Sequence, residues 1–598
     1  MCAWLSYHPY MQRIVYQSTR ACRKPAGKDS LAGRTGSGIV TIESAIAQGM
    51  PGDGGLYVPS GLPRLPERVF DPAFLSYAEL ATLVLQPFFP GWENGRLGKI
   101  IESAYGRAPD GAAKMSPDRG TGESPDRGAA CAPAACFDTG EICPLVPLHG
   151  LSSELDGGPE IYLLELFHGR TGAFKDIALS VLGGLLKESL ERLGEKRTSL
   201  VLAATSGDTG SATLTGFAGV PGILTAVLYP ADGTSDIQRL QMITQQSSSS
   251  FVAGVRGNFD DAQRLVKRLF GDDARLTAAG FAADSAGPGA APGQRSAAPG
   301  RASIVPAGLF PGVVLSSANS INIGRLLPQI VYYVKAWRDL AARHALGPGQ
   351  IMNVAVPSGN FGDILAAKYA KDMGLPIGRL LCASNANKVL ADFFATGVYD
   401  RRRELVATAS PSMDILVSSN LERLLFMASG GDPERTARLM DDLARRGWFE
   451  IDDAEKRYLS DFCGGWCGDE SAKSSIAKVW STDRVLIDPH TATAVEVLQR
   501  SVNTFSNSGP VVVAATASPF KFPESCLEAL GAEASARGSL VSARRLSSLT
   551  AISPPAFILG LEQKQVVGDR VVALDEVESA LAGFVSTAVG EVSACHGV

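Results

Sequence analysis

A single lysine is the first residue of this sequence that could do covalent chemistry. Lys175 lies in the stretch ELFHGRTGAFKDIALS, between Phe174 and Asp176 and directly before an apolar segment of helical type. An apolar environment disfavours the charged form of a lysine, so the pKa falls and the amine becomes a usable nucleophile. A lone lysine is more often a solvated surface group. The residues alone therefore leave both interpretations open.

A loop rich in hydroxyl groups and glycine follows an apolar run further along the chain. Residues 204–211 read ATSGDTGS, and a helical segment comes next. Free N–H groups at the start of a helix bind anions, and glycine permits close approach. The same residue types form ordinary helix caps, which fits the pattern equally well. The candidates for binding a carboxylate or a phosphate are Thr205, Ser206, Gly207, Asp208 and Thr209.

Two more strand-to-helix loops could bind a phosphate. Residues 357–363 read PSGNFGD, which matches neither the dinucleotide nor the P-loop glycine pattern. Residues 319–325 read NSINIGR, where Arg325 could grip a phosphate with two N–H groups while Ser320 and Asn322 donate hydrogen bonds. A capped helix start with a surface arginine is the competing interpretation. Thr516, after the run VVVAA, could bond a ring nitrogen or simply sit in a turn.

The elements that must position these loops form an α/β pattern. The apolar runs SLVLAA, GILTAVLYP, IMNVAVP and PVVVAA are each followed by helix-like sequence. Strands that are apolar on both faces and separated by helices indicate parallel sheets covered on both sides. Ligands in such sheets bind beyond the carboxyl ends of the strands. The candidate loops lie at those ends.

The chain divides into a small N-terminal part and a large catalytic part. We expect a mixed domain over residues 14–105, with a turn at PGDGG, a strand at LYVP and a helix over LSYAELATLVLQPFF. Residues 106–143 contain SPDRG twice and form a predicted low-complexity insertion, and residues 282–310 form a second one. Such segments cannot bury enough apolar surface to offset the entropy of ordering them, so we expect both to be disordered. Residues 144–590 make up the predicted catalytic region.

Composition excludes several function classes. The formal net charge of −5 comes with no basic patch, so we expect no nucleic-acid partner. No apolar run is long enough for a membrane helix. Six histidines and the spacing of Cys463 and Cys467 give no metal-ligand pattern, and reduced cytoplasmic thiols are expected. The basic start of the chain, with Arg13 and Arg20, is a weak alternative signal for an organelle.

Taken together, these motifs resemble the threonine synthase family, in its longer fungal and bacterial branch. The resemblance rests on DGGLYVP, ELFHGRTGAFKD, ATSGDTGSA, LYPADGTSDIQRLQM, NSINIGR, VPSGNFGDILAAKYAKDMGLPI, SPSMDILVSSNLERLL and LIDPHTATAV. It covers most of the chain outside the two insertions. It implies a fold-type II pyridoxal-phosphate enzyme, similar to the tryptophan synthase β subunit, with parallel-type sheets covered by helices. It also implies a lyase that converts O-phospho-L-homoserine and water to L-threonine and phosphate.

The resemblance also implies a role for each candidate residue. Lys175 would carry pyridoxal 5′-phosphate as a Schiff base, and Thr516 would face its ring nitrogen. The loop at 205–209 would receive the substrate carboxylate and part of its phosphate, and Ser320, Asn322 and Arg325 would bind the substrate phosphate. The residues that would hold the cofactor phosphate are Gly359, Asn360, Phe361 and Asp363.

Two positions depart from the family pattern. The usual H-G-P-T carries Arg170 in place of proline, which puts an extra cation near Lys175. The usual T-A-H-P-A-K-F carries Ser518 in place of histidine, which puts any role of that histidine in doubt. Two rival functions remain. One is a lyase that releases 2-oxobutyrate and phosphate from the same substrate, and the other is a non-catalytic protein that binds a phosphorylated ligand. The enzyme is expected to be a monomer or a homodimer.

Overall fold

The computed structural model describes four stretches of the chain. They are residues 14–21, 39–106, 141–270 and 310–595, apart from positions 72, 93, 94, 156, 246, 258, 260, 311, 348, 506 and 507. Most of both predicted insertions, residues 107–140 and 282–309, lies outside the described residues. The basic start of the chain, residues 1–13, lies outside them as well.

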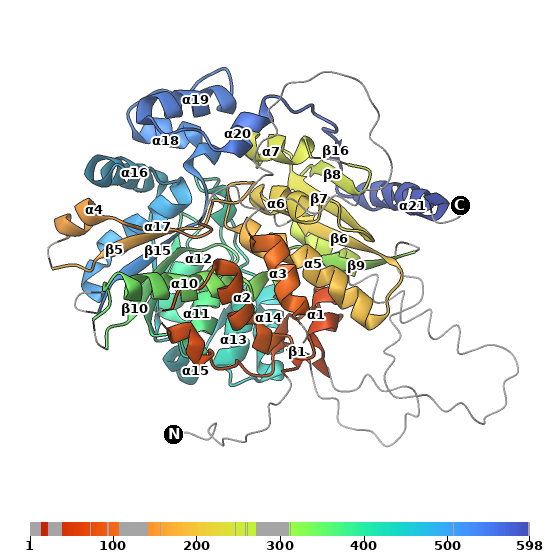
Figure 1. Cartoon of the computed structure of the whole chain (residues 1–598), viewed down its shortest axis with the longest axis horizontal. Coiled ribbons are helices and arrows are strands. Elements are labelled where there is room, and N and C mark those ends of the chain that lie inside the picture. Colours follow the sequence, from red (N-terminus) through yellow and green to blue (C-terminus); the bar gives the residue numbers. More distant parts are fainter. Residues whose placement is uncertain are drawn as a thin grey trace, which may run out of the picture.

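The N-terminal part is a small antiparallel sheet with three helices (Figure 1). The predicted strand at LYVP is confirmed. The predicted helix is confirmed, but it ends early, at Leu85, where Pro87 in the following 3₁₀ turn removes a backbone donor. Its start is fixed because the Ser76 and Glu79 side chains cap each other's backbone N–H groups. The elements are β1 (Tyr16–Ser18), β2 (Ile39–Val40), α1 (Ile42–Gln48), β3 (Tyr57–Pro59), η1 (Glu67–Phe70), α2 (Tyr77–Leu85), η2 (Gln86–Phe88) and α3 (Arg96–Tyr105).

The larger of two main sheets has six strands in the order β14-β11-β10-β15-β5-β4. All neighbouring pairs are parallel except β4 and β5, which are antiparallel. The runs IMNVAVP and PVVVAA form the two central strands, as predicted. The strands are β4 (Leu145–Pro147), β5 (Ile161–Glu165), β10 (Met352–Pro357), β11 (Ile377–Ser384), β14 (Phe462–Trp466) and β15 (Val511–Ala515).

The second main sheet has five parallel strands in the order β16-β8-β7-β6-β9. It lies to the right of the six-stranded sheet in Figure 1. The predicted runs SLVLAA and GILTAVLYP form β6 and β7. The strands are β6 (Thr198–Ala204), β7 (Ile223–Pro230), β8 (Ser250–Val255), β9 (Val313–Ser317) and β16 (Val571–Val572).

Helices cover both faces of each main sheet, which explains the uninterrupted apolar runs. Along β15, Val512 and Ala514 face one core cluster, while Val511, Val513 and Ala515 face another. Successive side chains of a strand point to opposite faces, so every position of this strand is buried. Each fully buried valine contributes roughly 1.5–3 kcal/mol relative to an exposed one. The sheets are therefore rigid platforms for the loops at their ends.

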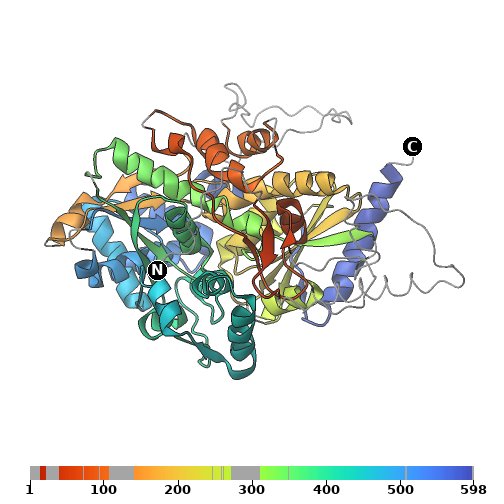
Figure 2. The same cartoon turned by 90° about the horizontal axis from the view of Figure 1, so that it is seen from below.

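The remaining elements complete the cover of the sheets. Figure 2 shows the N-terminal helices and α10 along one side of the molecule, and α21 beside the five-stranded sheet, where its buried side chains pack in one core cluster with a face of that sheet. The helices are α4 (His149–Glu154), α5 (Lys175–Leu193), α6 (Asp208–Gly216), α7 (Asp236–Ile243), α9 (Ile323–Leu326), α10 (Gln329–Ala342), α11 (Gly362–Asp372), α12 (Val389–Thr396), α13 (Leu421–Ala428), α14 (Pro433–Arg446), α15 (Asp453–Tyr458), α16 (Asp469–Asp483), α17 (Pro489–Arg500), α18 (Pro523–Ala529), α19 (Ser539–Thr550), α20 (Ala556–Leu561) and α21 (Val577–Cys595); the short elements are β12 (Val398–Asp400), η3 (Pro411–Met413), β13 (Trp448–Glu450), η4 (Val502–Thr504) and η5 (Pro519–Lys521).

The two cysteines near β14 are not paired with each other, and the described helices include no candidate membrane span. Cys463 and Cys467, at the start and just after the end of β14, are both free thiols. None of the described helices is long and apolar enough to cross a membrane.

Candidate active site

Loops from both main sheets meet at one cavity. It is lined by residues that follow β6, β9, β10 and β15, together with the start of α5. These are the strand ends at which the sequence placed its candidate loops. Of the predicted site residues, those that line the cavity are Lys175, Asp208, Thr209, Ser320, Arg325, Gly359, Asn360, Phe361, Asp363 and Thr516.

Lys175 is the first residue of α5, and its side chain is only 13% exposed. Its Nζ donates to Oδ2 of Asp208 over 3.1 Å and lies 4.5 Å from the centre of the Phe174 ring. Burial lowers the pKa of Lys175, and the nearby Asp208 carboxylate opposes part of that shift. The amine is therefore closer to its neutral, nucleophilic form than a surface lysine at the same pH.

Asp208 is the first residue of α6 and connects several segments. Oδ1 accepts from Nε2 of Gln238 over 2.6 Å and lies 2.9 Å from Nζ of Lys521, while Oδ2 accepts from Lys175. Burial alone would raise the pKa of Asp208, but the two ammonium groups hold it far below its usual range. This carboxyl group is therefore ionised at neutral pH.

Gly207 is required at the turn before Asp208. Its φ of +141° is one that residues with a side chain rarely adopt. A Cβ atom there would also lie 2.5 Å from the Gln238 side chain. The glycine thus lets α6 begin close to α7, which brings Gln238 within reach of Asp208.

The loop after β10 presents its backbone to the cavity. Phe361 has a φ of +63°, in the left-handed region, and its ring packs against Phe394 and Phe462 at centroid distances of 5.8 and 5.7 Å. The strained backbone is therefore held in place by buried aromatic packing. Among the described residues, none accepts a hydrogen bond from the main-chain N–H groups of Gly359, Asn360 or Phe361. Free N–H groups before a helix start make a phosphate-binding site.

Two buried oxygen atoms at this loop also have no partner among the described residues. They are Oδ1 of Asn360 and Oδ2 of Asp363. The other oxygen of Asp363 accepts from the hydroxyl groups of Tyr332 and Tyr333 at 2.6 and 2.5 Å. Burial raises the pKa of Asp363, and the two tyrosine hydroxyl groups oppose that shift. Unpaired buried polar atoms are costly, so their presence beside free N–H groups fits a bound polar group such as pyridoxal phosphate.

Arg325 is a buried cation without a carboxylate. Its side chain is 3% exposed, donates to the carbonyl group of Ala318, and forms no ion pair with any described residue. Its Nε atom is buried and has no hydrogen-bond partner among the described residues. Burial lowers the pKa of Arg325 to about 10, so the guanidinium group still carries its charge at neutral pH. A buried, uncompensated charge is expensive, and an anionic ligand would compensate it.

Thr516 helps to position the reactive lysine through its backbone. Its carbonyl oxygen accepts from the N–H group of Phe174 over 2.9 Å, and Ala173 and Ala517 form an isolated bridge beside it. Thr516 also lines the cavity.

Four predicted site residues do not line the cavity. Oγ1 of Thr205 accepts from the N–H groups of Gly207 and Gly210 at 2.8 and 3.0 Å, so this threonine closes the turn. Asn322 caps α9 and donates to the carbonyl groups of Ile46 and Ser317. The four residues away from the cavity wall are Thr205, Ser206, Gly207 and Asn322.

The two departures from the family pattern lie outside the cavity wall. Arg170 lines a separate small hollow with Asp176 and Thr215. Ser518 is 3% exposed, and its N–H group donates to the carbonyl group of Gly172. Neither residue is among those that line the cavity.

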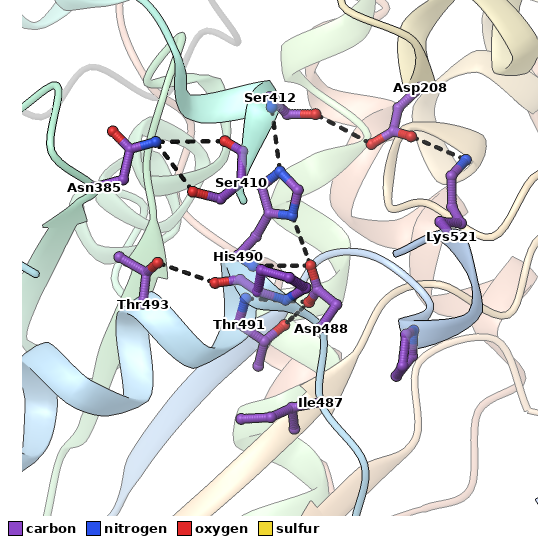
Figure 3. Close-up of polar contacts among 12 residues, drawn as sticks. Asp208, Asn385, Ser410, Ser412, Ile487, Asp488, His490, Thr491, Thr493 and Lys521 are labelled. Atoms are coloured by element: carbon purple, nitrogen blue, oxygen red, sulfur yellow. Dashed lines mark hydrogen bonds and ion pairs between the residues drawn. The ribbon is translucent and has the colours of Figure 1, made fainter. Parts of the chain in front are cut away.

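Figure 3 shows a polar network at the cavity wall to which the sequence analysis assigned no role. Nδ1 of His490 lies 2.6 Å from Oδ2 of Asp488, and its Nε2 accepts from the N–H group of Ser412 over 3.2 Å. Oγ of Ser412 in turn donates to Asp208 over 3.3 Å. His490 and Ser412 both line the cavity. Their motifs, DPHT and SPSMD, contributed to the resemblance, but spacing alone could not bring residues 78 positions apart together.

Comparisons with known proteins identify the family of the chain. Residues 31–105 match the family described as "Threonine synthase N terminus", residues 138–299 match "Pyridoxal-phosphate dependent enzyme", and residues 491–554 match "Threonine synthase, C-terminal". The threonine synthase of Pseudomonas aeruginosa is 34% identical over 490 residues, which cover 81% of this chain and 87% of that protein.

A human relative and a solved structure extend the comparison. Human threonine synthase-like 1 is 33% identical over 89% of this chain, and the match spans 64% of the human protein's length. The crystal structure of threonine synthase from Brucella melitensis with bound pyridoxal phosphate is 30% identical and has a TM-score of 0.70, covering 96% of this chain and 99% of that one. The architecture is thus that of a fold-type II enzyme. By sequence and by structure, the chain belongs to the threonine synthase family of pyridoxal-phosphate-dependent enzymes.

Proposed function

We propose that this chain converts O-phospho-L-homoserine and water to L-threonine and inorganic phosphate. The observation that carries the proposal is the meeting of three groups in one cavity: the buried amine of Lys175, the uncompensated guanidinium group of Arg325, and the free N–H groups after β10. One group can react, and two can hold phosphates. The substrate and the cofactor each carry one phosphate, so together they would use both phosphate-binding groups.

The cofactor would be held by the loop after β10 and by Lys175. The N–H groups of residues 359–361 and the start of α11 offer hydrogen bonds to its phosphate. The unpaired oxygen atoms of Asn360 and Asp363 are acceptors, so they are proposed to take hydrogen bonds from donor groups of the bound ligands rather than to hold the phosphate. Thr516 is proposed to face the ring nitrogen. When bound, pyridoxal phosphate supplies a conjugated ring that takes up the electrons of a breaking C–H bond.

Lys175 is proposed to be the proton-transferring group. Once displaced from the cofactor, its amine can accept a proton from the substrate Cα atom. Burial lowers the pKa of this amine, so a larger fraction is neutral at physiological pH than for a surface lysine. Asp208, at 3.1 Å from Nζ, can orient the amine between steps.

The phosphate of the substrate is proposed to leave toward Arg325. A buried guanidinium group stabilises the growing negative charge on the leaving phosphate more strongly than water does, because it is already oriented. Ser320, whose Oγ accepts from Nδ2 of Asn420 over 3.0 Å, is held at the same side of the cavity. Asp208 and Thr209 at the start of α6 are proposed to border the substrate carboxylate site.

Product analysis tests the proposed function. The purified chain with pyridoxal phosphate is incubated with O-phospho-L-homoserine, and phosphate, threonine and 2-oxobutyrate are measured. Equal amounts of phosphate and threonine are expected. Phosphate with 2-oxobutyrate would identify the rival lyase reaction, and cofactor binding without turnover would identify a non-catalytic homologue.

A Gly359→Ala variant is expected to bind pyridoxal phosphate more weakly. The new Cβ atom would lie 2.6 Å from the carbonyl oxygen of Ser412, so the loop would have to move. Overpacking of this kind costs about 1–3 kcal/mol, which corresponds to a roughly 5- to 150-fold rise in the dissociation constant. Cofactor titration followed by absorbance measures it. Gly61→Ala is the control, because nothing lies within 4 Å of its added Cβ, and equal affinities for both variants would remove the loop from the cofactor site.

A further inference from the structure

A second lysine is buried beside the reactive one. Lys521, the last residue of η5, is 0% exposed and does not line the cavity. Its Nζ donates to the carbonyl group of Thr171 over 2.7 Å and to Oε1 of Gln241 over 2.9 Å, and it lies 2.9 Å from Oδ1 of Asp208. All three partners are protein atoms, so this amine has no free position for a ligand.

The two lysines share one carboxylate. Oδ2 of Asp208 accepts from Lys175, while Oδ1 faces Lys521. Figure 3 shows Lys521 on one side of the Asp208 carboxylate and Ser412 on the other. One negative charge therefore faces two amines, and only one of the two is open to the cavity.

We propose that Lys521 is a positioning residue that binds Asp208 on the side away from the cavity, and thereby weakens the hold of Asp208 on the ammonium form of Lys175, which favours the neutral, reactive amine. The inference rests on the proposed role of Lys175 as the reacting amine. Lys521 acts through Asp208 and touches neither cofactor nor substrate.

Lys521 weakens the attraction between Asp208 and the Lys175 ammonium group, because the two amines share one carboxylate. If Lys521 were absent, the whole charge of Asp208 would stabilise the ammonium form of Lys175, and an opposite charge at this range raises a lysine pKa. With Lys521 present, the carboxylate is already compensated, and the second cation repels the first. Burial lowers the pKa of Lys175 most, Asp208 raises it, and Lys521 and Arg325 lower it. The other titratable groups that line the cavity are Asp363 and His490.

A purely structural role would have a different signature. Lys521 joins the loop before Lys175 to α6 and α7 through Thr171, Asp208 and Gln241. Loss of these bonds lowers the free energy of unfolding, because removing one partner leaves buried polar groups unpaired. It does not by itself move the titration midpoint of Lys175.

Competitive acylation of the full chain, stripped of cofactor, separates the two roles. Trace acetic anhydride labels amines only in the neutral form, and mass spectrometry of the Lys175 peptide across pH gives the midpoint of its titration. For Lys521→Met, the midpoint is expected to rise by about one pH unit, so labelling below the midpoint falls about tenfold. Lys521→Arg, which keeps the charge, is expected to stay within a few tenths of a unit of the wild type.

Two controls keep the test decisive. Lys368→Met removes another buried lysine, paired with Asp372 at 2.5 Å, and is expected to leave the Lys175 midpoint unchanged. In an Asp208→Asn background, Lys521→Met is expected to shift the midpoint much less, because the carboxylate that couples the amines is gone. A folded Lys521→Met chain with the wild-type midpoint would overturn the proposal, and so would an equal shift in both backgrounds.

The result is independent of turnover. If the chain proves inactive on O-phospho-L-homoserine but the midpoint shifts as expected, the proposed function fails and the role of Lys521 stands. If the chain makes threonine and the midpoint does not move, the proposed function stands and the proposed role of Lys521 fails.

Discussion

Lys175→Ala is expected to abolish both the visible absorbance band of the bound cofactor and phosphate release from O-phospho-L-homoserine. The buried amine beside Asp208 is proposed both to bind the cofactor covalently and to transfer the proton. General base catalysis alone is worth up to roughly 10⁴-fold, so the rate should fall by at least that factor. Absorbance spectra and a phosphate assay measure the two losses.

The matched control for this change is Lys187→Ala. Lys187 lies on the same helix but is 42% exposed, and its amine is 3.8 Å from Glu191 at the surface. Lys187→Ala should keep both the absorbance band of the bound cofactor and the rate of phosphate release. If Lys175→Ala kept its absorbance band, the amine assigned to the cofactor would be the wrong one.

Arg325→Met is expected to raise KM for the phosphorylated substrate by roughly 100-fold. The methionine keeps an apolar stem in the buried site but removes the charge that no described carboxylate compensates. A charge-assisted hydrogen bond contributes about 1.5–3 kcal/mol, which supports a loss of this size. Steady-state kinetics with KM and kcat resolved separately measure it.

Arg325→Lys refines the interpretation. Lysine keeps the charge but loses the planar fork of N–H groups, so KM should lie between those of the wild type and Arg325→Met. Inorganic phosphate should inhibit the wild type competitively and Arg325→Met much less. A KM equal to that of the wild type in Arg325→Met would place the substrate phosphate elsewhere.

The architecture could be predicted because its signals are local. Both central strands of the six-stranded sheet and two of the five-stranded sheet were identified from apolar runs that end in glycine- and hydroxyl-rich loops. Burial on both faces favours apolar side chains at most positions of such a strand. Helix α2 was predicted at the right place but too long, because Pro87 changes its last turn to a 3₁₀ turn.

The site was only partly predictable, because its decisive contacts join distant residues. Composition could not distinguish the buried Lys175 from a surface lysine, and the family pattern was needed. Thr205 and Asn322 have the residue types of ligand-binding groups but use their side chains for local caps. Conversely, the pairs His490 with Ser412 and Lys521 with Asp208 are 78 and 313 positions apart and form only when the chain has folded.

The most direct test of the account is to find which amine carries the cofactor. Two buried lysines face Asp208, and only Lys175 opens to the cavity. Borohydride reduction of the full chain with bound pyridoxal phosphate makes the linkage permanent, and peptide mass spectrometry then locates it. The expected result is a pyridoxyl phosphate group on the peptide that contains Lys175 and on no other. Attachment to the peptide that contains Lys521, or to no peptide at all, would contradict the account.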